Sequence, residues 1–162
     1  MNPDATQMNA IDALQTSYVM ALDAGDMTAW AATFSTAPET SYFCISAEND
    51  RRGLPIALMY DDCRARIDDR ITFVDQVWVG TYQPYRTRHL VQRLTCEPVG
   101  LNVYRVMSSF LIMMTAEGGA TVVMTSGVYR DVIEVQGNHA VFREKRAVYD
   151  ADVLPRYLVF PF

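Results

Sequence analysis

The 162-residue sequence predicts an α+β fold in which N-terminal helices pack on a curved, mostly antiparallel sheet. In the first half, apolar residues recur with a helical period. In the second half, four extended runs are separated by short turns of Gly, Pro and Asn. We expect one domain over residues 1–162. Its expected parts are a helical part at about 5–80 with one strand near 39–48, a sheet part at about 85–151 and an apolar tail at 152–162.

The chain begins with a pattern typical of two helices and a strand. The first helix would bury an apolar face formed by Ile11, Leu14, Tyr18 and Leu22. Gly25 is suited to end this helix, because glycine accepts the left-handed conformation that a helix C-terminus often requires. Asp26 is suited to cap a short second helix that runs through Trp30 towards Phe34. Residues 39–48 are rich in β-branched and aromatic side chains, which predicts a strand, and "NDRRG" predicts a loop.

A second helical pattern starts at Leu54. Its apolar stripe steps by three or four residues through Ile56, Tyr60, Cys63, Ile67, Ile71, Val74 and Trp78. The stretch is expected to form one long helix or two helices with a bend. Asp62 and Arg66 are spaced for an ion pair one helical turn apart. The acidic pairs Asp61–Asp62 and Asp68–Asp69 are expected on a solvated or salt-bridged face.

The second half is expected to form the sheet. Its extended runs are residues 86–97, 101–116, 121–136 and 140–150. Short connections between long strands favour an antiparallel meander. Helices that cover the concave face of such a sheet would give a cone-shaped domain, the kind shared by nuclear transport factor two and scytalone dehydratase.

Composition excludes several classes of function. The net charge of −5 argues against general affinity for nucleic acid, whose phosphates require clustered Lys and Arg. No apolar run reaches the roughly 18 residues of a membrane span, and the N-terminus lacks the pattern of a secretory signal. The three cysteines form no CxxC motif and are expected to be reduced thiols. We therefore expect a cytoplasmic protein that binds neither nucleic acid nor membrane.

The candidate chemistry centres on the two histidines of the chain, His89 and His139. A Rieske cluster needs two Cys and two His in close pairs, and a facial-triad iron site needs two His and a carboxylate. His139 lies in the turn "QGNHA", so we expect no metal or cofactor site on this chain. In a cone-shaped domain, His89 and Asp23 would be suited to act as acid and base in an interior pocket. The alternative is a structural His89, tied to a carboxylate or a carbonyl.

A set of landmarks runs in order along nearly the whole chain. These are "YVMALDAGDMTAWAATF" (18–34), "AENDRRGLPIALMYDDCRARIDDRI" (47–71), "RTRHLVQRL" (86–94), "SSFLIM" (108–113), "SGVYRDVIE" (126–134) and "LPRYLVFPF" (154–162). Together they resemble the small, or beta, subunit of bacterial aromatic-ring-hydroxylating (Rieske non-haem iron) dioxygenases. Within that family, "LPIALMYDDC" and "VWVGTYQPYRTRHLVQR" most resemble the salicylate and anthranilate hydroxylase branch.

This resemblance implies a structural role. In such oxygenases an alpha subunit carries the Rieske [2Fe–2S] cluster, the mononuclear iron and the substrate pocket, and a ferredoxin and a reductase supply its electrons. The beta subunit has the cone fold without an assigned active site, and three alpha and three beta subunits assemble. The resemblance therefore implies a non-catalytic subunit in the degradation of aromatic compounds, with His89 as a structural or interface residue. The alternative function is a stand-alone dehydratase or isomerase with His89 as acid or base.

The C-terminal tail is the main candidate for assembly. A solvated terminus is rarely so apolar, and Pro155 and Pro161 disfavour a regular helix. The tail is therefore expected to lie extended, either over its own sheet or against another subunit in a homotrimer or an α3β3 hexamer. The candidate interface residues are Arg86, Arg88, Leu154, Tyr157, Phe160 and Phe162.

Overall fold

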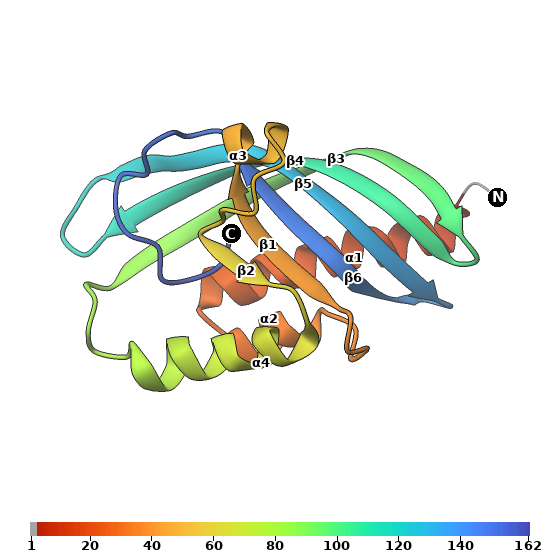
Figure 1. Cartoon of the computed structure of the whole chain (residues 1–162), viewed down its shortest axis with the longest axis horizontal. Helices are drawn as coiled ribbons and strands as arrows, with labels where there is room; N and C mark the ends of the chain where they lie inside the picture. Colours follow the sequence, from red (N-terminus) through yellow and green to blue (C-terminus); the bar gives the residue numbers. More distant parts are fainter. Residues whose placement is uncertain (1–2) are drawn as a thin grey trace.

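A computed structural model describes residues 3–162. Helices α1, α2 and α4 lie on one side of a long, twisted sheet (Figure 1). The helices are α1 (Ala5–Ala24), α2 (Met27–Ala32), α3 (Ala47–Arg51) and α4 (Arg64–Thr72), which continues into the π-helix η1 (Phe73–Val77). The strands are β1 (Ser41–Ser46), β2 (Met59–Asp61), β3 (Tyr85–Gly100), β4 (Val103–Ala116), β5 (Thr121–Gln136) and β6 (His139–Tyr149). The predicted α+β class is confirmed.

The sheet has six strands in the order β2-β1-β6-β5-β4-β3. The predicted meander is confirmed, because β3, β4, β5 and β6 pair antiparallel in sequence order. β1 pairs parallel with β6, which joins the first half of the chain to the last strand. Inward-facing side chains of the strands alternate with outward-facing ones, as the burial of β4 shows. The inward side chains pack against α1, which contacts β3, β5 and β6.

The C-terminal end of α1 and the start of α2 follow the predicted capping residues, and the start of α1 has a cap that was not predicted. The side chain of Asp4 accepts a hydrogen bond from the backbone N–H of Gln7, and the side-chain oxygen of Gln7 accepts one from the backbone N–H of Asp4, which is a capping box. Gly25 ends α1 with φ +69°, the left-handed conformation predicted for it. The Asp26 side chain accepts from the backbone N–H of Ala29 and so caps α2, as predicted.

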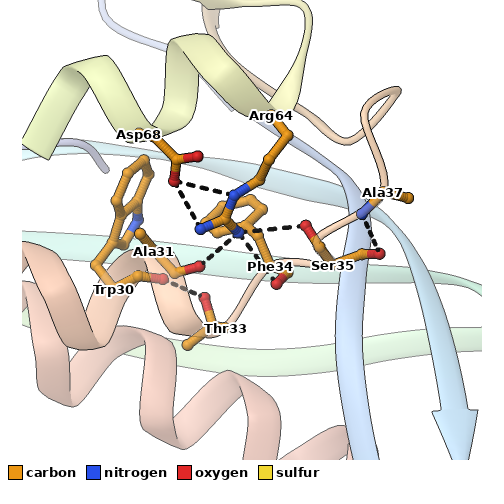
Figure 2. A network of polar contacts seen from close by, with 8 residues as sticks. All are labelled: Trp30, Ala31, Thr33, Phe34, Ser35, Ala37, Arg64 and Asp68. Atoms are coloured by element: carbon orange, nitrogen blue, oxygen red, sulfur yellow. Dashed lines mark hydrogen bonds and ion pairs between the residues drawn. The ribbon is translucent and has the colours of Figure 1, made fainter.

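Arg64 joins α4 to the end of α2 (Figure 2). Its Nη1 donates to the carbonyl oxygens of Ala31, Phe34 and Ser35, at 2.9, 3.2 and 3.2 Å. Asp68 holds the other side of the guanidinium through Nε and Nη2, at 3.0 and 2.7 Å. Carbonyls at a helix C-terminus lack intrahelical partners, so one arginine satisfies them and fixes the two helices together.

The prediction of helix from Leu54 onwards is wrong for its first part. Residues 54–58 are irregular and β2 follows, so only α4 and η1 are helical. Ile56 is 62% exposed, so it forms no part of a buried stripe, whereas Ile67 and Val74 are buried. Of the two positions predicted for Asp61, solvated or salt-bridged, it has the salt-bridged one: it is buried on β2 rather than on a helix, and it accepts hydrogen bonds from Arg70 at 2.5 and 2.6 Å. The predicted loop at "NDRRG" is largely the short helix α3.

Candidate functional site

The two histidines lie in different parts of the sheet. His89 is on β3 and His139 begins β6, with β4 and β5 between these strands. The side chain of His89 is 1% exposed, whereas His139 is exposed beside a turn. Among residues 3–162, no three His, Cys, Asp or Glu side chains are grouped so that they would hold a metal ion. The arrangement of the His, Cys, Asp and Glu side chains in these residues therefore does not fit an iron centre.

The structure brings together the two sequence-predicted residues His89 and Asp23. Asp23 lies near the C-terminal end of α1, and the alternation of β3 turns His89 towards this helix. Nδ1 of His89 lies 2.6 Å from Oδ1 of Asp23. The backbone N–H of His89 and the hydroxyl of Thr87 also donate to the Asp23 carboxylate, at 3.2 and 3.0 Å. Asp23 therefore fastens β3 to α1 through three hydrogen bonds.

The hydrogen bonds to Asp23 define the protonation of the pair. Partial burial alone would raise the pKa of Asp23, but the hydrogen bonds and charge of His89 and the Thr87 hydroxyl together hold this pKa below its ordinary value. Asp23 is therefore a carboxylate at neutral pH, and Nδ1 of His89 donates its proton to it. The other ring nitrogen, Nε2, is buried and has no hydrogen-bond partner among residues 3–162.

A polar network that the sequence patterns do not predict is buried inside the cone. Nζ of Lys145 lies 3.0 Å from Oδ2 of Asp131 and donates to Oε1 of Gln15 at 3.2 Å. The ammonium also faces three rings, with centroids 4.3, 3.8 and 4.3 Å away, which belong to Tyr18, Tyr129 and Phe142. Alternation along β5 was the available signal, because Asp131 stands between the inward-facing Tyr129 and Ile133.

Burial perturbs both charges of this network. It raises the pKa of Asp131 to about 6, although Lys145 and Gln15 act in the opposite direction. It also lowers the pKa of Lys145 to about 8, although Asp131 stabilises the ammonium. No part of either side chain is exposed, so the pair is a feature of the core rather than a site open to solvent.

The C-terminal tail closes the cone. The hydroxyl of Tyr18 donates to the carbonyl of Phe162, and the hydroxyl of Tyr42 accepts from the backbone N–H of Phe162 at 3.0 Å. The Tyr85 hydroxyl accepts from the N–H groups of Val159 and Phe160 at 3.2 and 3.3 Å. Of the two predicted arrangements, the tail adopts the one in which it covers its own domain.

The structure corrects one of the residues predicted to lie at a subunit interface. Phe162, chosen from the sequence as an interface residue, is 1% exposed because it is buried within its own chain. Leu154 and Phe160 are half-buried against the same core. Tyr157 is 56% exposed. Arg86 and Arg88 are exposed on β3 and stay interface candidates.

Comparison with known proteins gives the family. Residues 18–156 match the model of the family described as the ring hydroxylating beta subunit. The chain belongs to this family. Over 148 residues it is 22% identical to the anthranilate 1,2-dioxygenase small subunit of Burkholderia cepacia. The match covers 91% of this chain and 89% of that subunit.

Solved structures agree with this assignment. The chain superimposes on a protein of Novosphingobium aromaticivorans, described as the beta subunit of an aromatic-ring-hydroxylating dioxygenase, with a TM-score of 0.77, 25% identity and 88% of each chain covered. It also superimposes on a protein of the same organism described as a scytalone dehydratase, with a TM-score of 0.66, 16% identity and 93% and 89% of the chains covered. This second likeness concerns the fold alone and confirms the predicted cone-shaped architecture. In residues 3–162 of this beta subunit, no helix combines the length and apolarity that a membrane span requires.

Proposed function

We propose that this beta subunit is a non-catalytic structural subunit of a ring-hydroxylating oxygenase that degrades aromatic compounds. It would support an alpha subunit that carries the Rieske cluster and the mononuclear iron, with three copies of each subunit in the complex. A ferredoxin and a reductase would deliver electrons to the alpha subunit, and the complex would be cytoplasmic. The anthranilate relative favours an aromatic substrate of the salicylate and anthranilate type.

The observation that carries this proposal is the filled interior of the cone. Small molecules bind in concave cavities with a few polar groups, and a catalytic cone would need such a space. Here the interior holds packed aromatic side chains, the buried Asp131–Lys145 pair and the end of the tail at Phe162. A packed interior is expected of a subunit that provides binding surfaces for other subunits rather than an active site.

The outer face of the sheet offers such a surface. Leu90 on β3 and Leu111 on β4 are cross-strand neighbours, and Met113 on β4 is paired with Val123 on β5. Leu90 and Val123 are each 55% exposed, so these side chains form an apolar outer patch. Burial of this patch against another subunit would stabilise an assembly by about 25 cal/mol for each Å² removed from water.

A second function rests on the geometry of His89. Its Nδ1 is 2.6 Å from Asp23, an arrangement that orients an imidazole for proton transfer. A stand-alone dehydratase or isomerase would use Nε2 as the base. This nitrogen is buried, so the geometry favours a structural role for His89 over acid–base catalysis.

An affinity purification of the tagged chain from its native host separates the two functions. The structural subunit should co-purify with a larger, iron-containing protein, and the isolated chain should lack dehydratase and isomerase activity. Activity of the isolated chain that disappears in His89→Ala, together with failure to retain an iron-containing partner, would overturn the proposal.

A further inference from the structure

We propose that the outer face of β3 and β4 binds an acidic surface of the alpha subunit, whose carboxylates accept hydrogen bonds from Arg86 and Arg88 beside the apolar outer patch. The inference rests on the proposed function, because it names the surface through which a structural subunit would act and the chemistry of its partner. It adds a charge requirement that an apolar patch alone does not impose.

Arg86, Arg88 and Leu90 project from the same face of β3. Alternate residues of a strand point to the same side, and the intervening His89 points towards α1. All three outward side chains belong to exposed residues. Their cross-strand partners on β4 are, in the same order, Thr115, Met113 and Leu111. The two arginines therefore stand at the border of the apolar outer patch.

Neither Arg86 nor Arg88 forms an ion pair with a carboxylate of residues 3–162. Arg88 donates to the backbone carbonyl of Thr87, at 3.2 Å. The carboxylate of Asp150 is held instead by Ser126 on β5, whose hydroxyl donates to it at 3.0 Å. Because a guanidinium has five N–H donors, both arginines keep donors for an acceptor from another molecule.

The charges on this face favour a different protein over the same face of a second copy. In a face-to-face contact the arginines of the two copies would meet, and like charges in a desolvated contact oppose association. Contact over the apolar patch also removes water from the guanidinium groups at its border, so the partner must supply acceptors. Carboxylates match the donors of a guanidinium with two parallel hydrogen bonds. The partner surface should therefore be apolar over the patch and acidic beside it.

The test is the dissociation of the complex that the full chain forms with its co-expressed alpha subunit, measured by mass photometry over a series of dilutions. In the double variant Arg86→Glu, Arg88→Glu, the apparent Kd should rise at least about tenfold, because repulsion replaces charge-assisted hydrogen bonds. Added salt should weaken the unmodified complex more than the variant complex, since salt screens the attraction. Self-association of the isolated chain should be the same with and without the two substitutions.

Arg66→Glu is the matched control. Arg66 is an exposed arginine of α4, which lies on the helical side of the sheet (Figure 1), so its reversal should change the Kd by less than about twofold. A complex that tolerates the double variant as well as it tolerates Arg66→Glu would overturn the inference and leave the proposed function standing. Loss of self-association in the double variant would also overturn the inference, because the face would then bind a second copy. Failure of the unmodified chain to bind its alpha subunit would overturn both.

Discussion

The hydroxyl of Tyr42 and the backbone N–H of Phe162 form a hydrogen bond of 3.0 Å that joins positions 120 residues apart. Tyr42 lies on β1 and is fully buried, so this contact holds the tail inside the core. The aromatic ring of Phe162 also packs near Phe110 and Tyr149. The tail is therefore part of the folded domain, which changes what its truncation would do: loss of residues 157–162 would disturb the core as well as any assembly.

Phe162→Ala should lower the free energy of unfolding by about 3–5 kcal/mol, because it leaves a cavity in the packed interior. Chemical denaturation monitored by tryptophan fluorescence measures this loss. Val153→Ala, at an exposed position of the same tail, should change the stability by less than about 0.5 kcal/mol. If both variants are equally stable, the tail does not occupy the core in solution.

Asp61→Ala should lower the free energy of unfolding by about 3 kcal/mol, because it leaves Arg70 without the partner that it holds in a largely buried position. The adjacent Asp62 offers a matched control. It lies just before α4 and forms the predicted ion pair with Arg66 of that helix, at 3.3 Å and with both side chains exposed. Asp62→Ala should therefore cost no more than about 0.5 kcal/mol. Similar losses in the two variants would contradict the buried position of the Asp61–Arg70 pair.

Asp131 should give the chain a specific dependence of stability on pH. Its pKa is raised by burial from 3.8 to about 6, so the folded chain binds this proton more tightly than the unfolded chain does. The contribution of Asp131 to stability should then fall as the pH rises through this window. The unfolding free energy of the wild type minus that of Asp131→Asn should be larger at pH 4 than at pH 7. A difference that grows with pH would show that the carboxylate form is the one favoured by folding.

His89→Ala should lower the free energy of unfolding by about 1–3 kcal/mol, since it removes a partner from the partly buried Asp23. The turnover of a correctly assembled oxygenase should hardly change. His139→Ala, at the exposed histidine, should alter neither quantity. A loss of more than about a hundredfold in turnover, with stability and assembly intact, would assign acid–base catalysis to His89.

Most of the fold follows from local sequence patterns. Local sequence identifies Gly25 and Asp26 as capping residues and predicts the bounds of the four long strands to within a few residues, because short turns determine antiparallel pairing. The error at Leu54 has a physical cause. Ile56 and Tyr60 have helical spacing by coincidence, but β2 forms because its residues pair with Phe43 and Cys44 on β1. That contact is non-local and leaves no helical or turn signal in the sequence.

The candidate site was predictable only in part. His89 and Asp23 stood out because the chain has few histidines and the sheet alternates, and the structure places them in contact. The Asp131–Lys145 pair was not foreseen. The two residues are cross-strand partners on β5 and β6, and charged residues on strands are usually assigned to the solvent face. Their inward orientation depends on the rings of Tyr18 and Phe142, which come from distant parts of the chain.

Sedimentation velocity of this beta subunit, alone and co-expressed with the alpha subunit of the same host, tests the central claim most directly. We predict co-sedimentation as a complex of three alpha and three beta subunits. Leu90→Asp on the apolar outer patch should weaken assembly, whereas Leu101→Asp at the exposed tip of the β3–β4 hairpin should have less effect. A chain that stays monomeric at high concentration and also fails to join its co-expressed alpha subunit would contradict the structural-subunit function.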